Sequence, residues 1–390
     1  MKKSKVLIVA PFPPPFGGIA RYALDLWNSV ELNTEFELHR LNTAKGEKFL
    51  HGEGRSERTW LRGLYFLKPS NWLFLFYLFL NYLEYMYMLL KIKPDIVHVH
   101  TCSYFGFLRS GVFLFLTKII SCRRILHLHN AIDTFYQENK DHRFLRSLIK
   151  WSLNQATEYV VLSEGLRIWV ESNLGKKAVV IWNACNSSNY LPRKNDKVNF
   201  FSNFPQAQGK IIITLIGGLY PHKGAFDLIE VASNLTPAER ENLLFILPGK
   251  GEHEKIETLI IENHLEDYVL IPGVLPEEVK DNLVRNSDIF TLPSYAEGQP
   301  IAILEAMSAS LPIIASRVGS VSEIVHEDVN GFLINPGDQI GLRNYILTLA
   351  NNPELRSTMG KASRQYIEKR HDIKCLFESI ANLYRNWSQS

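Results

Sequence analysis

The chain has 390 residues, 46% of them hydrophobic and 21% charged, which excludes a disordered protein and suggests two globular domains of ordinary size. The net charge of +3 is uneven, because residues 1–190 hold 24 Lys and Arg against 15 Asp and Glu, whereas the remainder is acidic. A basic first half suits an anionic membrane surface or nucleic acid, but the sequence has no basic-aromatic module of the kind that recognises nucleic acid.

Short runs rich in Val, Ile and Leu alternate with helical segments along the whole chain, which predicts an α/β fold with parallel sheets covered on both faces. A polar, structureless break from about Asn183 to Gly209 predicts two doubly wound, Rossmann-like domains, at residues 1–190 and 210–365, joined by a linker at 191–209. Ligands bind beyond the carboxyl ends of such strands, so we expect them in a cleft between the domains. The predicted strands are Val6–Ala10, Ile96–His100, Ile125–His129, Tyr159–Leu162, Val179–Trp182, Ile211–Ile216, Leu244–Leu247, Val269–Ile271, Ile289–Leu292, Ile313–Ala315 and Phe332–Ile334.

The turn after the first predicted strand contains Gly17 and Gly18. Glycines let backbone N–H groups approach a ligand closely, and the start of the following helix offers further N–H groups to an anion. A simple turn explains the same two glycines, so this pattern alone leaves both interpretations open.

The stretch Trp72–Leu90 is an almost unbroken apolar run whose length is borderline for a membrane span. Asn81, Glu84 and four tyrosines weaken that interpretation, and the strands before and after the stretch should lie in one sheet. Apolar aromatics with a basic fringe favour a helix that lies on a membrane surface, and a helix buried against its own sheet is the alternative. The flanking basic residues are Arg55, Arg58, Arg62, Lys68, Arg109, Lys118, Arg123 and Arg124.

Two His-x-His pairs, His98 with His100 and His127 with His129, lie on predicted strands. Alternate residues of a strand share a face, so the two members of each pair can point the same way. A zinc site is conceivable, but no further ligand has fitting spacing, and we expect buried, hydrogen-bonded histidines instead. His129 ends its strand, where a ligand-binding residue is expected.

A strand, loop and helix at residues 288–307 carry the strongest functional pattern. The helix is predicted to begin at Pro300, where a missing N–H costs no hydrogen bond, and its N-terminus suits an anion such as a diphosphate. Glu297 in the loop and Glu305 in the helix add two carboxylates. The segment therefore suits a ligand that has both phosphates and hydroxyls, as a nucleotide-sugar does, and two solvated acids are the alternative.

The run Ser-Tyr-Ala-Glu-Gly-Gln-Pro, followed by Leu-Glu-Ala-Met, resembles the E-x7-E signature of retaining glycosyltransferases of family 4, which have the GT-B fold. The resemblance covers most of the chain and is most specific at residues 217–338. It implies that Glu297 lies by the hydroxyls of the donor sugar, that Glu305 holds the ribose, and that a C-terminal helix at 366–390 crosses back to the first domain. It also implies donor contacts from Gly298, Gln299, Pro300 and Ile301.

The second domain opens with Gly-Gly-Leu-Tyr-Pro-His-Lys-Gly, which resembles the family pattern Gly-Arg-Leu, three residues, then Lys-Gly. In that pattern the arginine and lysine clamp the diphosphate. Lys223 matches the lysine, but Gly218 stands in place of the arginine, which leaves the clamp short of one charge unless His222 or a basic residue of the first domain replaces it. An arginine restored at position 218 should tighten diphosphate binding, provided that Gly218 does not need a positive φ angle.

The resemblance assigns further residues to the donor. It places Gly17 and Gly18 near the donor phosphates and the acceptor, and His129 beside the anomeric centre of the sugar. Gly249, in the run Pro-Gly-Lys-Gly, corresponds to a nucleotide-binding loop, and Val274 to a loop that meets the base through its backbone.

We therefore expect a retaining glycosyltransferase that moves a sugar from a nucleotide-sugar to a saccharide acceptor, with His129, Lys223 and Glu297 as catalytic residues. Lys223 and the helix N-terminus at Pro300 would stabilise the leaving diphosphate, and no Asp-x-Asp metal site stands out, so neither a metal nor a cofactor is expected. A nucleotide-sugar epimerase of the same fold and a catalytically inactive, membrane-associated partner subunit are the alternatives.

The place of action follows from the cysteines and the apolar stretch. The four cysteines have no paired spacing, as expected for a protein of the reducing cytoplasm. The basic first half and Trp72–Leu90 favour peripheral attachment to the cytoplasmic face of a membrane, where the acceptor would be a lipid-linked saccharide.

Overall fold

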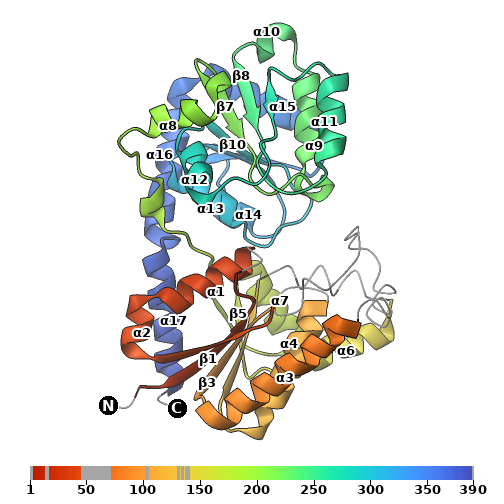
Figure 1. Cartoon of the computed structure of the whole chain (residues 1–390), viewed down its shortest axis with the longest axis vertical. Coiled ribbons are helices and arrows are strands. Elements are labelled where there is room, and N and C mark those ends of the chain that lie inside the picture. Colours follow the sequence, from red (N-terminus) through yellow and green to blue (C-terminus); the bar gives the residue numbers. More distant parts are fainter. Residues whose placement is uncertain are drawn as a thin grey trace. The chain divides into compact units, whose positions relative to one another are not determined.

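The computed structural model describes residues 3–13, 17–44, 72–101, 105–129, 132, 136 and 141–388. The chain divides into two compact units, Met1–Trp182 with Phe377–Ser390, and Asn183–Leu376. Each unit holds a six-stranded parallel sheet with helices on both faces (Figure 1). The architecture is thus a GT-B-type pair of Rossmann-like units, as the alternation of apolar runs and helices predicts.

The sheet of the first unit has the order β2-β1-β3-β4-β5-β6, with parallel pairing throughout. The chain runs from β1 outward to β2 and then returns to β3 on the other side of β1. The order therefore reverses between β1 and β3, and the carboxyl ends of strands at such a reversal are where ligands of open α/β sheets bind. The strands are β1 (Lys5–Ala10), β2 (Glu37–Asn42), β3 (Ile96–Thr101), β4 (Arg123–Leu128), β5 (Glu158–Val161) and β6 (Ala178–Val180).

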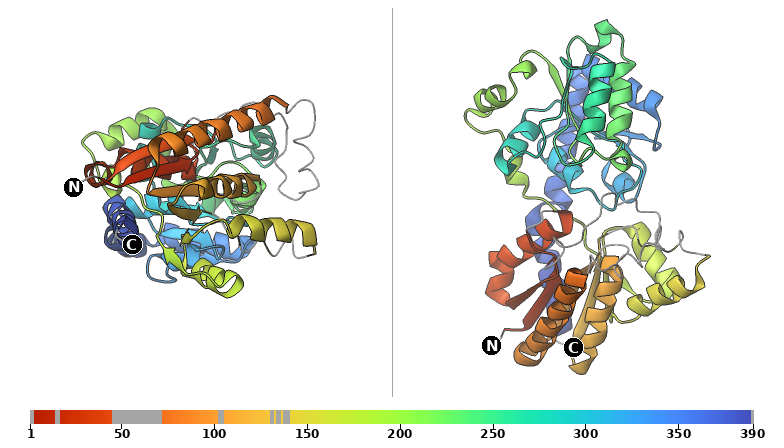
Figure 2. Two further views of the ribbon diagram at one scale, coloured as in Figure 1. Left: turned by 90° about the horizontal axis from the view of Figure 1, so that it is seen from below. Right: turned by 45° about the vertical axis from the view of Figure 1, so that its right-hand side comes forward.

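Helices cover both faces of this first sheet (Figures 1 and 2). On one face lie α1 (Gly18–Asn28), α2 (Val30–Glu35) and the end of α17 (Ile373–Ser388), and the histidines of β3 and β4 face this layer. On the other face, the helices pack into one apolar core with Leu7, Val99 and Leu126 of the sheet. These helices are α3 (Trp72–Ile92), α4 (Phe105–Leu116), which continues into η4 (Thr117–Ile119), α6 (Arg143–Leu153) and α7 (Glu164–Leu174).

The sheet of the second unit has the order β12-β11-β10-β7-β8-β9 and is also parallel. Here the chain moves from β7 to β8 and β9 and then crosses to β10 on the other side of β7. The reversal lies between β7 and β10, so the loops after these two strands meet at the carboxyl edge. The strands are β7 (Ile211–Thr214), β8 (Leu243–Ile246), β9 (Val269–Leu270), β10 (Ile289–Leu292), β11 (Ile313–Ser316) and β12 (Gly331–Ile334).

The helices of the second unit form two layers (Figure 1). One apolar core joins the sheet to α9 (Ala225–Ser233), α11 (His253–Glu262) and α15 (Gln339–Asn351). The opposite layer contains α8 (Asp196–Asn203), α12 (Glu277–Arg285), α13 (Ile301–Ser308) and α16 (Pro353–Arg370). The short elements are η5 (Ser187–Tyr190), η6 (Pro205–Ala207), η7 (Pro221–Lys223), α10 (Pro237–Arg240) and α14 (Val321–Ile324).

Each predicted strand is present, with bounds that differ by at most two residues, but the structure adds β2. Only Leu38 and Leu41 of β2 are buried, and the two polar residues between them are partly or fully exposed. An edge strand has solvent on one side, so β2 lacks the continuous apolar run that marks the central strands.

The stretch 191–209, which the sequence predicts to be a structureless linker, instead contains α8 and η6. Its three apolar residues Phe200, Phe204 and Ala207 are buried in a core with Leu244 of the sheet. The boundary between the units falls earlier, between Trp182 and Asn183. The prediction fails because Phe200 of α8, Phe204 at its C-cap and Ala207 of η6 anchor a stretch that is polar on average.

Candidate functional site

The loops that follow β7 and β10 bring Lys223 and Glu297 together. The ammonium of Lys223 lies 2.7 Å from a carboxylate oxygen of Glu297, and the hydroxyl of the buried Ser294 donates to the same oxygen at 2.8 Å. The Glu297 side chain is 8% exposed and the Lys223 side chain 23%. A cation and an acid thus lie side by side at the point where the strand order reverses.

Close backbone packing fixes these loops. Gly224 has a φ of 73°, and a Cβ there would overlap the carbonyl group of Pro293, so only glycine lets the two loops touch. Gly319 has a φ of 53° and lies equally close to the carbonyl group of Glu297. Ser320 adds hydrogen bonds from its N–H and hydroxyl to the carbonyl oxygen of Gly298. The Glu297–Gly298 segment is therefore held from both sides.

The helix α13 begins at Ile301, with Pro300 as its N-cap, one residue later than the sequence predicts. The side chain of Pro300 does not cap this end, and the first N–H groups of a helix point out of its N-terminus, where they can bind an anion. Gln299, predicted to touch the donor, is buried, and its side-chain oxygen accepts a hydrogen bond from the N–H of Asn183 at 2.5 Å. That side chain therefore serves the fold.

Glu305, on the second turn of α13, lies beside Lys280 of α12. The ammonium of Lys280 is 2.7 Å from Glu305 and 3.2 Å from Asp281, and the hydroxyl of Tyr190 donates to Asp281 at 3.0 Å. Burial lowers the pKa of Lys280, but the two carboxylates outweigh burial and leave this pKa above its ordinary value. The sequence pattern identifies Glu305 but gives no sign of Lys280, because α12 has no motif of its own.

The loops after β7 and β8 pack backbone to backbone around three residues without a Cβ. Gly218, Gly249 and Gly251 all have positive φ angles, of 94°, 142° and 145°. A Cβ on Gly218 would lie 2.9 Å from the carbonyl oxygen of Lys250, and the N–H of Leu219 donates to that oxygen at 2.7 Å. The prediction that an arginine at 218 tightens diphosphate binding required that Gly218 has no need of a positive φ angle. Gly218 does have a positive φ, so the position requires glycine and the prediction does not apply.

Val274 and Gly249 lie on connected loops. The N–H of Gly249 donates to the carbonyl oxygen of Gly273 at 2.8 Å, and the adjacent Val274 has an exposed side chain. The predicted nucleotide residues Gly218, Gly249 and Val274 thus come from three neighbouring loops at the carboxyl edge of one sheet.

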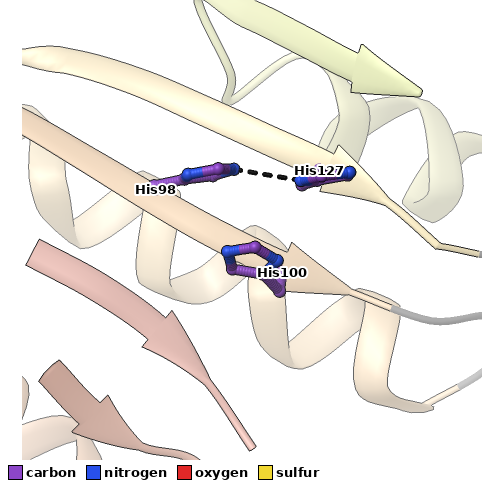
Figure 3. A group of neighbouring side chains, drawn as sticks. All are labelled: His98, His100 and His127. Carbon is purple, nitrogen blue, oxygen red and sulfur yellow. Dashed lines mark hydrogen bonds between the residues drawn. The ribbon is translucent and has the colours of Figure 1, made fainter. Parts of the chain in front are cut away.

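In the first unit, the four histidines form one buried cluster on β3 and at the end of β4, with Tyr22 of α1 against three of them. His98 joins Tyr384 at 2.7 Å and His127 at 3.2 Å, and His100 joins His129 at 2.9 Å. Figure 3 shows the rings of His98 and His127 facing each other across the two strands. The expectation of buried, hydrogen-bonded histidines is confirmed.

The same cluster is a group with metal-ligand chemistry, because one ligand nitrogen each from His98, His100 and His127 lies within 4.8 Å of the others (Figure 3). Burial lowers the pKa of His98 and of His129 to about 3, so both are neutral. Among the described residues, the titratable groups that act on these imidazoles are other histidines, so no acid would offset the charge of a divalent ion there. Hydrogen-bonded core histidines fit the surroundings better than a metal site.

His129 is 6% exposed, and one of its ring nitrogens is occupied by His100. Gly17 and Gly18, in contrast, are exposed at the start of α1. Gly17 has an extended φ of −166°, with open space where a Cβ would lie. These three residues lie beyond the carboxyl ends of β1 and β4, as the sequence predicts.

The helix α3 presents a broad apolar face to solvent. Among the described helices it alone is long and apolar enough to span a membrane, and 22% of its most apolar window is buried. Phe74, Tyr85 and Leu89 pack toward the sheet, so α3 lies along its own unit. The exposed apolar residues of α3 are Trp72, Leu73, Phe76, Phe79, Leu80, Leu83, Tyr87 and Leu90.

The basic fringe predicted beside this stretch is only partly seen. Arg55, Arg58, Arg62 and Lys68 lie outside the described residues. Arg109 and Arg124 donate to backbone carbonyl oxygens of the unit, and Arg123 faces Glu158 at 3.6 Å, so these three serve the fold. Lys118 lies over the exposed ring of Phe115, and Lys91 over that of Tyr87. The described cations next to exposed aromatics are therefore lysines.

Two family models match this chain, one in each half. Residues 16–189 match the model of the family described as Glycosyltransferase Family 4, and residues 196–366 match that of Glycosyl transferases group 1. An uncharacterized glycosyltransferase of Methanocaldococcus jannaschii is 26% identical over 295 residues, which is 75% of this chain and 76% of that protein.

A second sequence relative and a solved structure are similar to most or all of the chain. The UDP-Gal:alpha-D-GlcNAc-diphosphoundecaprenol alpha-1,3-galactosyltransferase of Escherichia coli is 26% identical over 312 residues, 76% of each chain. The structure of sucrose-phosphate synthase from Thermosynechococcus elongatus superimposes with a TM-score of 0.78 at 18% identity and covers 100% of both chains. The first likeness is one of sequence, and the second shows that the two chains share a fold.

Proposed function

We propose that this chain, whose residues 16–189 and 196–366 match two glycosyltransferase family models and whose fold is of the GT-B type, transfers a sugar from a nucleotide-sugar to a saccharide hydroxyl with retention at the anomeric carbon. The observation that carries this proposal is the pair of Lys223 and Glu297, 2.7 Å apart beside the N-terminus of α13. An acid for sugar hydroxyls and a cation for phosphate stand together there, as a nucleotide-sugar requires.

The chemical step needs stabilisation of the leaving group. When the bond from the anomeric carbon to the diphosphate breaks, negative charge grows on the phosphate oxygen. The ammonium of Lys223 and the free N–H groups of α13 provide a positive field that is in place before the substrate binds. The acceptor oxygen forms its bond to the anomeric carbon on the same face, and its proton passes to the departing diphosphate.

The remaining residues bind the donor. Glu297 accepts hydrogen bonds from the sugar and Glu305 from the ribose, while the other assigned positions offer backbone groups or surface. In the second unit these are Gly218, Gly249, Val274, Gly298, Gln299, Pro300 and Ile301. In the first unit they are Gly17, Gly18 and His129, which rest on their motifs and on their places at the carboxyl ends of β1 and β4.

No metal or cofactor takes part in this proposal. Lys223 and the helix N-terminus supply positive charge that a divalent ion supplies to other enzymes that cleave a diphosphate bond. Transfer that continues unchanged in the presence of a chelator is the expected result, and activity restored only by added Mg²⁺ or Mn²⁺ would overturn this part.

For the acceptor we propose a lipid-linked saccharide at a membrane surface. The support is the apolar face of α3, flanked by Lys91 and by Lys118, which lie over exposed aromatic rings. Such a face suits insertion among lipid headgroups. A span is disfavoured because β2 and β3, which precede and follow α3 in the chain, lie in one sheet. The name of the Escherichia coli relative, which includes a diphosphoundecaprenol acceptor, agrees with this choice.

The deciding experiment incubates the purified protein with a panel of nucleotide-sugars and lipid-linked saccharides and identifies products by mass spectrometry. Proton NMR of the new linkage then gives its anomeric configuration. A product with the configuration of the donor supports the proposal, and an inverted product contradicts retention. Donor isomerised without an acceptor would indicate an epimerase, and donor binding without turnover an inactive partner subunit.

A further inference from the structure

Lys280 is a partly buried cation that the proposed reaction does not use. It extends from α12 toward α13, its side chain is 21% exposed, and it lies 2.7 Å from Glu305 and 3.2 Å from Asp281. Tyr190 donates to Asp281 at 3.0 Å. Four polar side chains thus form one network with Glu305 at one end.

The network keeps the Lys280 charge in place. Removing an ammonium from water is costly unless carboxylates surround it, and here two do. The pKa of Tyr190 is raised by burial and then by Glu305 and Asp281, so its hydroxyl stays a neutral donor to Asp281. Asp281 is thereby oriented from one side by Tyr190 and from the other by Lys280, and Lys280 presents its remaining N–H bonds to Glu305.

A glutamate that binds two ribose hydroxyls must be ionised and held in one rotamer. A free glutamate side chain loses about 1.5–2 kcal/mol of rotamer entropy when it is fixed, which weakens any ligand that must fix it. When an ammonium already holds the carboxylate in the folded protein, this rotamer entropy is lost before the ligand binds and does not weaken binding. The geometry therefore favours a role for Lys280 in donor binding that goes beyond joining two helices.

We propose that Lys280 is the positioning residue of the ribose site, which holds the Glu305 carboxylate oriented toward the 2′- and 3′-hydroxyls of the nucleotide. This inference rests on the proposed function, because it takes Glu305 as the ribose ligand. A purely structural ion pair between α12 and α13 is the competing explanation, and it predicts no dependence on the ribose hydroxyls.

The test uses a matched pair of ligands. The native protein is first titrated by calorimetry with the diphosphates of uridine, guanosine, adenosine and cytidine, and the tightest of these is compared with its 2′,3′-dideoxy counterpart. Lys280→Met removes the charge and keeps the length of the side chain, and Lys280→Arg keeps the charge. Arg285→Met is the control. Arg285 lies on α12, as Lys280 does, and forms a more deeply buried ion pair with Asp196 of α8.

We expect Lys280→Met to weaken binding of the ribonucleotide about tenfold or more while leaving the dideoxy nucleotide unchanged. Lys280→Arg should restore most of the affinity, and Arg285→Met should lower stability without separating the two ligands. Adding Lys280→Met to Glu305→Ala should cost no further affinity, since the lysine acts through the glutamate.

Two results overturn the inference alone. Both results assume that Glu305→Ala weakens the ribonucleotide more than the dideoxy nucleotide. If Lys280→Met then weakens both nucleotides equally, or changes the affinity for neither, Lys280 has only a structural role. If Glu305→Ala itself fails to separate the two nucleotides, the proposed role of Glu305 is wrong and the inference falls with it. The Lys280→Arg variant keeps the comparison measurable if Lys280→Met does not fold.

Discussion

The ammonium of Lys223 lies 2.7 Å from the carboxylate of Glu297, although 74 residues separate the two in the chain. The pairing arises because β7 and β10 are neighbours in the sheet, so the loops that follow them share one edge. Before a ligand binds, each residue partly neutralises the other. Under the proposed function, a diphosphate that approaches the lysine should free the glutamate to face the sugar.

This pairing predicts different defects for the two residues. Lys223→Met should lower kcat about a hundredfold or more, the usual loss when one electrostatic stabiliser of a transition state is removed. Glu297→Gln should lower turnover more than it lowers nucleoside diphosphate affinity, because its contacts are to the sugar. Steady-state kinetics and calorimetry measure the two quantities.

The matched control for Lys223 is Lys255→Met, since Lys255 pairs with Glu252 on an exposed helix end. This control should leave both kcat and affinity within twofold of native, as expected for an exposed ion pair. Small and equal effects of Lys223→Met and Glu297→Gln on kcat and on affinity would show that the assigned roles are wrong.

The second prediction concerns Gly218. An arginine there must adopt a φ near 94° and place its Cβ 2.9 Å from the carbonyl oxygen of Lys250. Gly218→Ala should therefore lower the free energy of unfolding by about 1–3 kcal/mol, and Gly218→Arg should not tighten nucleoside diphosphate binding. Urea denaturation and calorimetry check both statements.

Gly17→Ala is the comparison for this prediction, because Gly17 is extended and has open space at the Cβ position. It should cost less than about 0.5 kcal/mol of stability. Tighter diphosphate binding by a stable Gly218→Arg protein would instead show that the loop tolerates the side chain and that the missing charge limits the native enzyme.

The third prediction concerns the apolar face of α3. Replacing Phe76, Phe79 and Leu83 with serine should reduce binding to anionic liposomes at least tenfold, since each fully buried apolar side chain contributes about 1.5–3 kcal/mol. High salt should weaken native binding, because lysines near an anionic surface add about 1 kcal/mol each. Liposome sedimentation at low and high salt measures both effects.

Ile340→Ser is the control for α3, because Ile340 is an exposed apolar residue of the second unit. It should leave liposome binding unchanged. Absence of native binding to anionic liposomes at low salt would contradict membrane attachment and would favour a soluble acceptor, and binding that only detergent reverses would favour a span.

The fourth prediction concerns pH. His98 and His129 have pKa values of about 3 in the folded protein, because burial opposes their charged forms, against about 6.5 in the unfolded chain. The unfolded state therefore binds more protons below pH 6.5. The stability from these neutral histidines is complete above pH 6.5 and falls by up to about 1.4 kcal/mol per pH unit and per histidine as the pH drops toward 3.

Tryptophan fluorescence during urea unfolding measures this effect in the first unit, because all seven tryptophans belong to it. The midpoint should fall between pH 7.5 and pH 5. His127→Gln, which cannot become charged, should reduce the dependence on pH. A midpoint that is the same at both pH values would mean that the cluster titrates normally.

Much of the fold could be predicted from the sequence because central parallel strands are apolar on both faces and stand out as continuous runs. The edge strand β2 and the helix α8 could not, since only Leu38 and Leu41 of β2 and only Phe200 of α8 are buried. In both cases the tertiary environment decides the structure, and average polarity conceals it.

The candidate site shows the same division. The loop with Glu297 could be predicted because a glycine, a proline and two acids have fixed places along the chain. The pairing of Glu297 with Lys223 follows only from the order of strands, and that of Glu305 with Lys280 only from the packing of α12 against α13. Contacts between residues far apart in sequence leave no local pattern.

The first unit is built from two segments that lie on either side of the second unit in the chain, and this affects the order in which the units can fold during synthesis. Tyr384, which is fully buried against His98, leaves the ribosome after residues 183–376 of the second unit. A nascent chain can therefore close its second unit while the histidine face of the first still lacks its cover. Until Tyr384 has emerged, that face lacks the side chain that covers it.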